Sequence, residues 1–156
     1  MKEKRLEILL WSIAFPGFGQ ILNGQVIKGM AFILLEIIIN INSSFNMAII
    51  HSFTGNIIQS IEVTNYQWLM FYPCVYMFAI WDAYRHADGE GVPYAFVPFA
   101  FSAYTVTVGL IYSPIFKVGG VLIGPVWLPI LFLFPGIAFG LYLRKILLRP
   151  SKNSMP

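Results

Sequence analysis

The stretch FPGFGQILNGQVIKGMAFILLEIIINI, residues 15–41, decides the fold. It joins two apolar segments, residues 6–22 and 25–41, through a turn that is rich in glycine. Pro16 removes a backbone donor and Gly17 loosens the chain further, so a straight first helix is not expected. We expect a kinked short helix, or a re-entrant segment shielded by neighbouring helices, and this region should resemble a helical hairpin.

Composition points to a membrane protein. The chain has 156 residues, of which 58% are hydrophobic and 11% are charged. A soluble domain carries about 25% charged residues, so this chain has too few to cover a water-facing surface. The apolar residues come in long blocks, as in bilayer spans, which need roughly 20 mostly apolar residues each. We therefore predict an all-α, polytopic integral membrane helical bundle in a single domain, with four spans plus the kinked N-terminal segment.

Three further apolar blocks are predicted to span the bilayer, at residues 66–84, 92–113 and 119–148. The stretch 42–65 is mixed in polarity and contains no Lys or Arg. Its apolar spacing favours an extracytoplasmic amphipathic helix that lies on the membrane or caps the bundle. An irregular loop is the alternative for this stretch. Residues 114–118 are predicted to form a tight turn.

The basic residues decide the predicted orientation. If all five apolar segments crossed, the basic C-terminal tail would lie outside, against the positive-inside rule. With four crossings, nine of the ten Lys and Arg residues lie inside and only Lys117 lies outside. We therefore predict a cell-membrane protein with both termini in the cytoplasm.

Two polar motifs carry the remaining information: FPGFGQILNGQVIKG at residues 15–29 and IWDAYRHADG at residues 80–89. Together they resemble bacterial members of the two-transmembrane domain family, over roughly residues 8–88. In that family a short apolar helix runs into a Gly-x-Gly turn, a second glycine-flanked turn leads into another helix, and a Trp-Asp element follows. The matching positions are Pro16, Gly17, Gly19, Gln20, Gly24, Gln25, Lys28, Gly29, Trp81, Asp82 and Arg85.

The chain also departs from the family pattern. Ile21 and Leu22 stand where the family has an aromatic pair, the stretch 42–65 is longer than in a minimal member, and the last two predicted spans have no counterpart. The resemblance implies the fold and residence in a bacterial cytoplasmic membrane, and it implies no activity.

The glycine motif also has a physical interpretation that does not depend on the family. Glycines let two backbones approach closely in a membrane, where no hydrophobic drive brings helices together. The amides of Gln20, Asn23 and Gln25 can bond the backbone groups that Pro16 and the turns leave unpaired. We therefore favour a packing role over a ligand site. Two further small-residue pairs, Gly120 with Gly124 and Gly136 with Gly140, favour tight helix contacts in the last block.

Glu36 is the best candidate for a functional polar residue, because a carboxylate within a membrane span is costly and usually functional. The alternatives are a position near the end of the span, or a protonated carboxyl group bonded to a neighbour. We expect partners among the amides of Gln20, Asn23 and Gln25, with Lys28 as the other possibility. Asp82 and Arg85, which are three residues apart, can pair and form a solvated anchor at a helix end.

No catalytic constellation stands out in the sequence. His51 and His86 are far apart, Cys74 is the single cysteine, and no phosphate loop or catalytic triad motif is found. We predict a non-enzymatic multi-pass membrane protein with a structural, assembly or regulatory role, without a metal or cofactor. Its expected partners are the lipid bilayer and other membrane proteins or further copies of the chain, and no nucleic acid. The alternative is a small oligomeric transporter or channel that uses Glu36 as a polar station; an enzyme acting on lipid is less favoured.

Overall fold

The computed structural model describes residues 2–87 and 92–149. Helices dominate this part of the chain, which confirms the all-α class, and one short β-hairpin interrupts them. The helices are α1 (Lys2–Ala14), α2 (Phe18–Leu22), α3 (Val26–Ser43), α4 (Phe45–Phe53), α5 (Ile57–Val63), α6 (Tyr66–Leu69), α7 (Tyr72–His86), α8 (Phe96–Tyr112) and α9 (Gly124–Leu147). The strands are β1 (Lys117–Val118) and β2 (Val121–Leu122).

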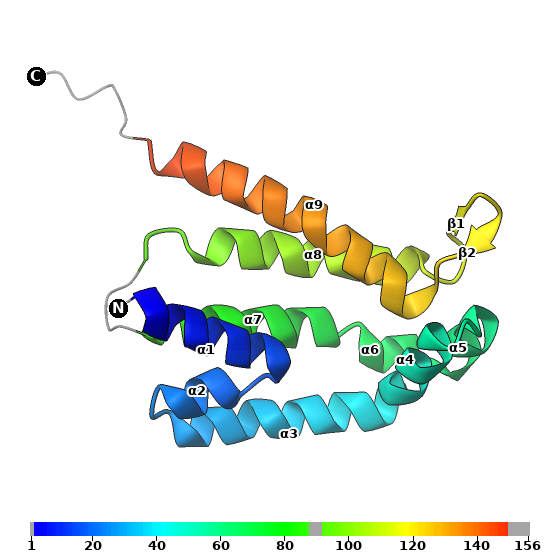
Figure 1. Ribbon diagram of the computed structural model, residues 1–156, viewed down its shortest axis with the longest axis horizontal. Coiled ribbons are helices and arrows are strands. Elements are labelled where there is room, and N and C mark those ends of the chain that lie inside the picture. Colours follow the sequence, from blue (N-terminus) through cyan, green and yellow to red (C-terminus); the bar gives the residue numbers. More distant parts are fainter. Residues whose placement is uncertain (1, 88–91, 150–156) are drawn as a thin grey trace, which may run out of the picture.

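Four helices, α3, α7, α8 and α9, run lengthwise through the molecule in alternating directions (Figure 1). Helix α1 begins and helix α9 ends at the same end, which we call the terminal end. Helices α4 and α5 and the β-hairpin lie at the opposite end, which we call the hairpin end. The most extensive helix contact joins α8 to α9, and α7 links this pair to the N-terminal half.

The N-terminal segment turns back instead of running through the bundle. Helix α1 ends at Ala14, just before Pro16, and α2 then leads back to the terminal end, where α3 begins (Figure 1). Gly17 has φ +104°, a value that L side chains rarely adopt, so glycine permits the reversal. The break predicted at Pro16 and Gly17 is confirmed.

Residues 42–65 are mostly helical, so the irregular-loop alternative is wrong. The stretch forms two short helices, α4 and α5, separated at Gly55, which has φ +82°. They cap the bundle against the start of α9, where the ring of Phe53 lies 4.6 Å from that of Trp127. The indole of Trp127 also donates a hydrogen bond of 3.3 Å to the carbonyl oxygen of Ser52.

The turn predicted at residues 114–118 is too short. Lys117 and Val118 pair antiparallel with Leu122 and Val121, so a β-hairpin fills the connection and α9 begins only at Gly124. Gly120 therefore lies in the hairpin and does not share a helix face with Gly124, which makes that predicted pair wrong. The other pair packs as expected, because a Cβ on Gly136 would lie 2.8 Å from Ser102 Cα, and one on Gly140 would meet Pro98.

Two helices of the described part of the chain, α3 and α9, are long and apolar enough to cross a membrane. Helix α8 is apolar but shorter, with 17 residues. The predicted span 66–84 is divided into α6 and α7, and Pro73 lies in the first turn of α7, where a missing backbone donor does no harm. Of the four lengthwise helices, α3 and α9 thus have the length and apolar composition of a membrane span, whereas α7 and α8 are shorter.

Candidate functional site

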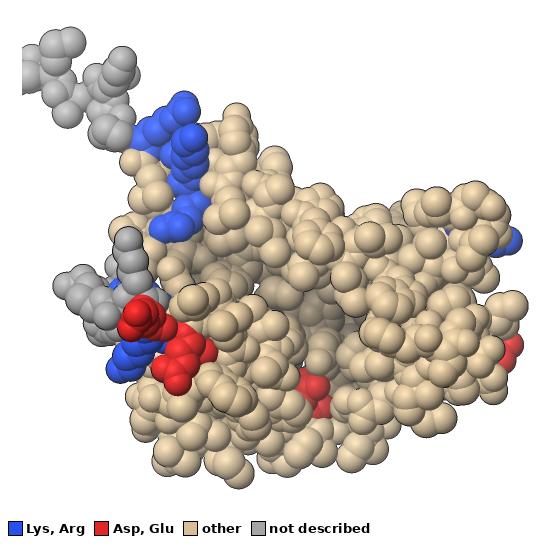
Figure 2. Space-filling view, viewed as in Figure 1, with Lys and Arg blue, Asp and Glu red and all other residues tan. Residues whose placement is uncertain are grey.

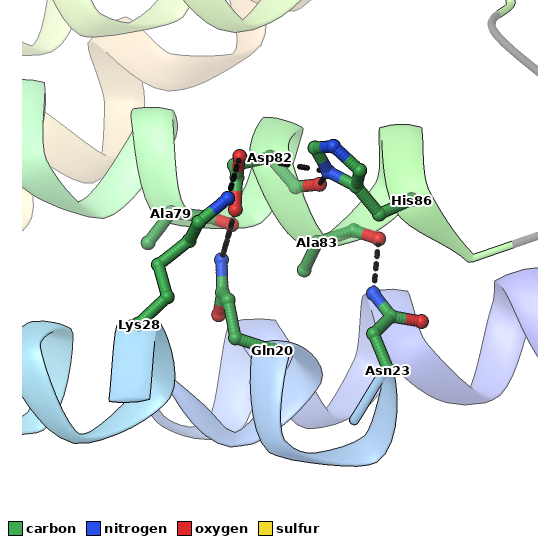
Figure 3. A network of polar contacts seen from close by, with 7 residues as sticks. All are labelled: Gln20, Asn23, Lys28, Ala79, Asp82, Ala83 and His86. Carbon is green, nitrogen blue, oxygen red and sulfur yellow. Dashed lines mark hydrogen bonds and ion pairs between the residues drawn. The ribbon is translucent and has the colours of Figure 1, made fainter. Parts of the chain in front are cut away.

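Asp82 of α7 is the centre of a buried polar network that joins the two sequence motifs (Figure 3). The residue is 5% exposed. Lys28 of α3 donates through Nζ to Asp82 Oδ1 at 3.0 Å. Gln20 of α2 donates through Nε2 to Asp82 Oδ2 at 3.1 Å and to the carbonyl oxygen of Ala79 at 2.7 Å. Asp82 is therefore no solvated anchor, because side chains from α2 and α3 cover it.

Two further side chains complete this network, which we call the Asp82 network (Gln20, Asn23, Lys28, Asp82 and His86). Asn23 donates to the carbonyl oxygen of Ala83 at 2.8 Å, so the turn after α2 is fastened to the backbone of α7. His86 Nδ1 donates to the carbonyl oxygen of Asp82 at 2.7 Å and lies 3.5 Å from Asp82 Oδ1. The amides do bond backbone groups, as predicted, but those groups belong to α7 and not to the turn at Pro16.

Arg85 does not pair with Asp82. Its guanidinium lies over the ring of Trp81, 5.4 Å from the centroid, which is the geometry of a cation–π contact. The spacing of three residues allowed the pairing, but Lys28 and Gln20 approach Asp82 from other helices and occupy its carboxylate. Arg85 is left on the exposed side of α7.

Glu36 is buried, at 6% exposure, but its predicted partners are wrong. Its carboxyl group hydrogen-bonds to Tyr72 of α7, whereas the amides of Gln20 and Asn23 bond to α7 nearer the terminal end. Lys28 is likewise committed to Asp82. Gln25 supplies no bond to Glu36 either, and its side-chain oxygen is buried without a hydrogen-bond partner in the described part of the chain.

A small apolar cavity of about 160 Å³ lies beside the tyrosines near Glu36. Tyr72 and Tyr76 line it, together with residues of α8 and α9, while Glu36 is not among the lining residues. The hydroxyl of Tyr76 donates to the carbonyl oxygen of Ile13. Glu36 thus lies against tyrosine and does not face an open polar cavity.

The motif glycines fall into two kinds. A Cβ on Gly17 would meet the carbonyl oxygen of Gly29, and a Cβ on Gly29 would lie 2.7 Å from the carbonyl oxygen of Gly17, so these two backbones touch. A Cβ on Gly19 would lie 2.7 Å from the Cβ of Ala83. Gly24 differs, because a Cβ there would meet nothing within 4 Å, and its φ of +77° marks it as a turn residue.

The Asp82 network offers few groups that could act in catalysis or bind a metal ion. Within residues 2–87 and 92–149, no group of three or more His, Cys, Asp or Glu side chains could hold a metal ion. The carboxylate of Asp82 is already engaged by an ammonium and an amide, an arrangement that fixes helices relative to one another. No protein-family model, curated protein or solved structure matches this chain.

Proposed function

We propose that this chain is a multi-pass membrane protein, without enzymatic activity, that serves a structural, assembly or regulatory role. The observation that carries the proposal is an inverted distribution of side chains, with small and polar groups inside and large apolar groups outside. Among the fully buried side chains, hydroxyl and amide groups are prominent: Ser12, Gln20, Ser43, Ser60 and Ser113 are each 0% exposed. Small residues are the usual contacts between helices in lipid.

The outer faces of the helices are apolar. Of the apolar stretch of α3, 28% is buried, and the same fraction holds for α9, which does not fit the core helices of a soluble protein. Soluble monomers rarely expose apolar patches larger than a few hundred Å². The most exposed apolar side chains are 66% to 89% exposed: Ile27, Ile41, Ile58, Tyr104 and Ile115.

The charges support an orientation. On the face in Figure 2, Lys and Arg side chains gather at the terminal end, and the flanks between the two ends are almost free of charge. Basic residues at this end include Arg85 of α7 and Arg144 and Lys145 of α9, whereas Lys117 belongs to the β-hairpin. By the positive-inside rule the terminal end faces the cytoplasm. The proposed topology has four crossings, by α3, by α6 with α7, by α8 and by α9, while α1 and α2 enter and return.

The resemblance to the two-transmembrane domain family is part of this proposal. What supports it is the Asp82 network, because Gln20 and Lys28 of the glycine-rich motif meet the aspartate of the Trp-Asp element. Trp81 and Arg85 lie against each other on another side of α7, toward the groove between α7 and α8. Gln20, Lys28 and Asp82, which come from both motifs, thus form one structural unit, which fits a packing role for them.

Cysteine labelling in intact cells tests membrane residence and topology. In a Cys74→Ser background, Gln59→Cys should react with an impermeant maleimide from outside, and Ser151→Cys should react only after permeabilisation. Gln59 is the better reporter at the hairpin end because it is exposed, whereas its neighbour Ser60 is 0% exposed. Labelling of position 151 from outside would overturn the topology, and recovery of the chain in the soluble fraction would overturn membrane residence.

The second candidate function is transport or conduction, and the observation that favours it is Glu36. This carboxyl group is buried in the middle of α3, a helix long and apolar enough to cross a membrane. Ionisable groups at such positions often lie on ion or proton pathways. Against it stands the environment of Glu36, which is the hydroxyl of Tyr72 and not a polar passage.

One pair of measurements separates the two functions. Purified in mild detergent from native membranes, the chain should retain another membrane protein, or further copies of itself, in stoichiometric amounts. In reconstituted vesicles, it should give no proton or cation flux above empty vesicles. Flux that Glu36→Gln abolishes would favour transport, and a monomer with neither partner nor flux would contradict the assembly role.

The stability of the Glu36 variants provides the control for that comparison. Glu36→Gln should keep the fold, because an amide still hydrogen-bonds to Tyr72, so a lost flux could not be blamed on unfolding. Glu36→Leu should lower the free energy of unfolding by about 1–3 kcal/mol, because it leaves a buried hydroxyl without its partner.

A further inference from the structure

An apolar groove runs between α7 and α8 on the flank of the molecule. It has a volume of about 510 Å³, within the range of roughly 300–1,000 Å³ in which pockets hold small organic molecules. Its lining residues recur every three or four positions along both helices, so the groove follows the helix axes. The seven steps from position 74 to position 81 on α7 give it a length of about 10 Å. The residues that line it include Cys74, Phe78, Trp81, Phe96, Phe99 and Ala103.

One end of the groove carries a positive charge. Trp81 lines the groove toward the terminal end, and the guanidinium of Arg85 lies 5.4 Å above its ring. Arg85 lies one turn beyond Trp81 on α7, and no ion pair of Arg85 is formed within residues 2–87 and 92–149. The same end of the molecule gathers most of the basic side chains seen in Figure 2. The groove is therefore apolar along its length and has the guanidinium of Arg85 at one end.

We propose that this groove binds an anionic phospholipid, with an acyl chain along Phe78 and Phe99 and the phosphate on the guanidinium of Arg85. The inference rests on the membrane residence proposed above, which makes the open side of the groove face lipid. Arginine binds phosphate through paired hydrogen bonds. Tryptophan is favoured at headgroup level, so Trp81 and Arg85 lie where a cytoplasmic-leaflet headgroup would be.

Native mass spectrometry of the full chain in detergent tests the headgroup preference. The probes are phosphatidylglycerol and phosphatidylcholine with identical acyl chains, which differ in net charge. The wild-type chain should bind phosphatidylglycerol about five-fold more tightly, the gain expected for one arginine near an anionic headgroup. Arg85→Gln should reduce this ratio to about one. Arg149→Gln is the matched control, because it removes the same charge from a residue just beyond α9 that does not line the groove, and it should keep the preference.

The single cysteine locates the bound lipid. Cys74 is exposed and lines the groove, so its alkylation by a maleimide reports whether the groove is filled. Phosphatidylglycerol should slow alkylation several-fold in the wild-type chain and less in Arg85→Gln.

A groove-filling variant tests the place of the acyl chain. Ala100→Phe, which adds a ring to the groove wall, should weaken the binding of both lipids and keep a normal unfolding temperature.

Each contrary outcome would overturn a different part of the proposal. Equal affinity for the two lipids, or an equal loss in Arg149→Gln, would overturn the assignment to Arg85. Unchanged alkylation of Cys74 on lipid binding would place the lipid elsewhere. Protection of Cys74 by a co-purifying protein would show that a partner helix occupies the groove. Recovery of the chain outside the membrane fraction would instead overturn the proposed function itself.

Discussion

Replacement of Asp82 by leucine should lower the free energy of unfolding by about 1–3 kcal/mol, because it leaves the buried amide of Gln20 without one acceptor, while Lys28, whose side chain is 42% exposed, can turn to solvent. Asp82 is 5% exposed and accepts hydrogen bonds from Lys28 and Gln20. Leucine would leave one amide hydrogen of Gln20 without an acceptor and would release Lys28. These bonds hold α2 and α3 against α7. The substitution should therefore mainly weaken the packing of the N-terminal segment against α7. A fall of about 5 °C in the unfolding temperature in detergent is the expected measurement.

Two controls make this prediction specific. Glu62→Leu removes an exposed carboxylate from α5 and should change stability by less than about 0.5 kcal/mol. Lys28→Met combined with Asp82→Leu should cost less than the sum of the two single changes, because each single change already breaks the same bond. If the two costs were additive, or if Asp82→Leu were as mild as Glu62→Leu, the Asp82 network would not hold the N-terminal segment in place.

The features that the sequence predicts well are local. Pro16 and Gly17 act on their own backbone, so the break between α1 and α2 follows from residue type alone. The helical nature of residues 42–65 follows from the spacing of their apolar side chains. The separation of a helix at Gly55 and the β-hairpin at Gly119 and Gly120 was missed, because both depend on positive φ values that glycine permits but does not require.

The features that the sequence does not predict join distant residues. Lys28 and Asp82 are separated by 54 positions, and nothing in either motif states that α3 and α7 bring them together. The sequence therefore favours Arg85 as the partner of Asp82, because sequence spacing identifies contacts only between residues three or four positions apart on one helix. Glu36 is a similar case, since its partner Tyr72 belongs to α7 and had not been singled out as a polar residue.

The Asp82 network and the α7–α8 groove share one helix, and this has a consequence for the proposed role. Asp82 faces α2 and α3, while Trp81 and Arg85 belong to the side of α7 that lines or borders the groove. On the first side, the carboxylate of Asp82 is bonded within the chain, to Lys28 and Gln20. The second side presents an aromatic ring and a cation outward, so contacts with lipid or with a partner are expected there. The division between an internal and an external face of α7 is what an assembly role needs.

Replacement of Gly17 by leucine should reduce the amount of folded protein in the membrane most strongly of all the glycine changes. A side chain there meets the backbone of Gly29 and lies 2.8 Å from Ile33 Cγ1, and its φ of +104° is strained for any L residue. Strain of about 1–3 kcal/mol and overpacking of about 1–3 kcal/mol together approach the total stability of a marginal protein. Gly24→Leu is the matched control, because Gly24 also has a positive φ, of +77°, but open space around it. Size-exclusion chromatography of the detergent extract should show a monodisperse peak for Gly24→Leu and a much smaller one for Gly17→Leu. Equal losses in the two variants would mean that backbone strain alone matters, and the close approach of α2 to α3 would then not be what fixes the N-terminal turn.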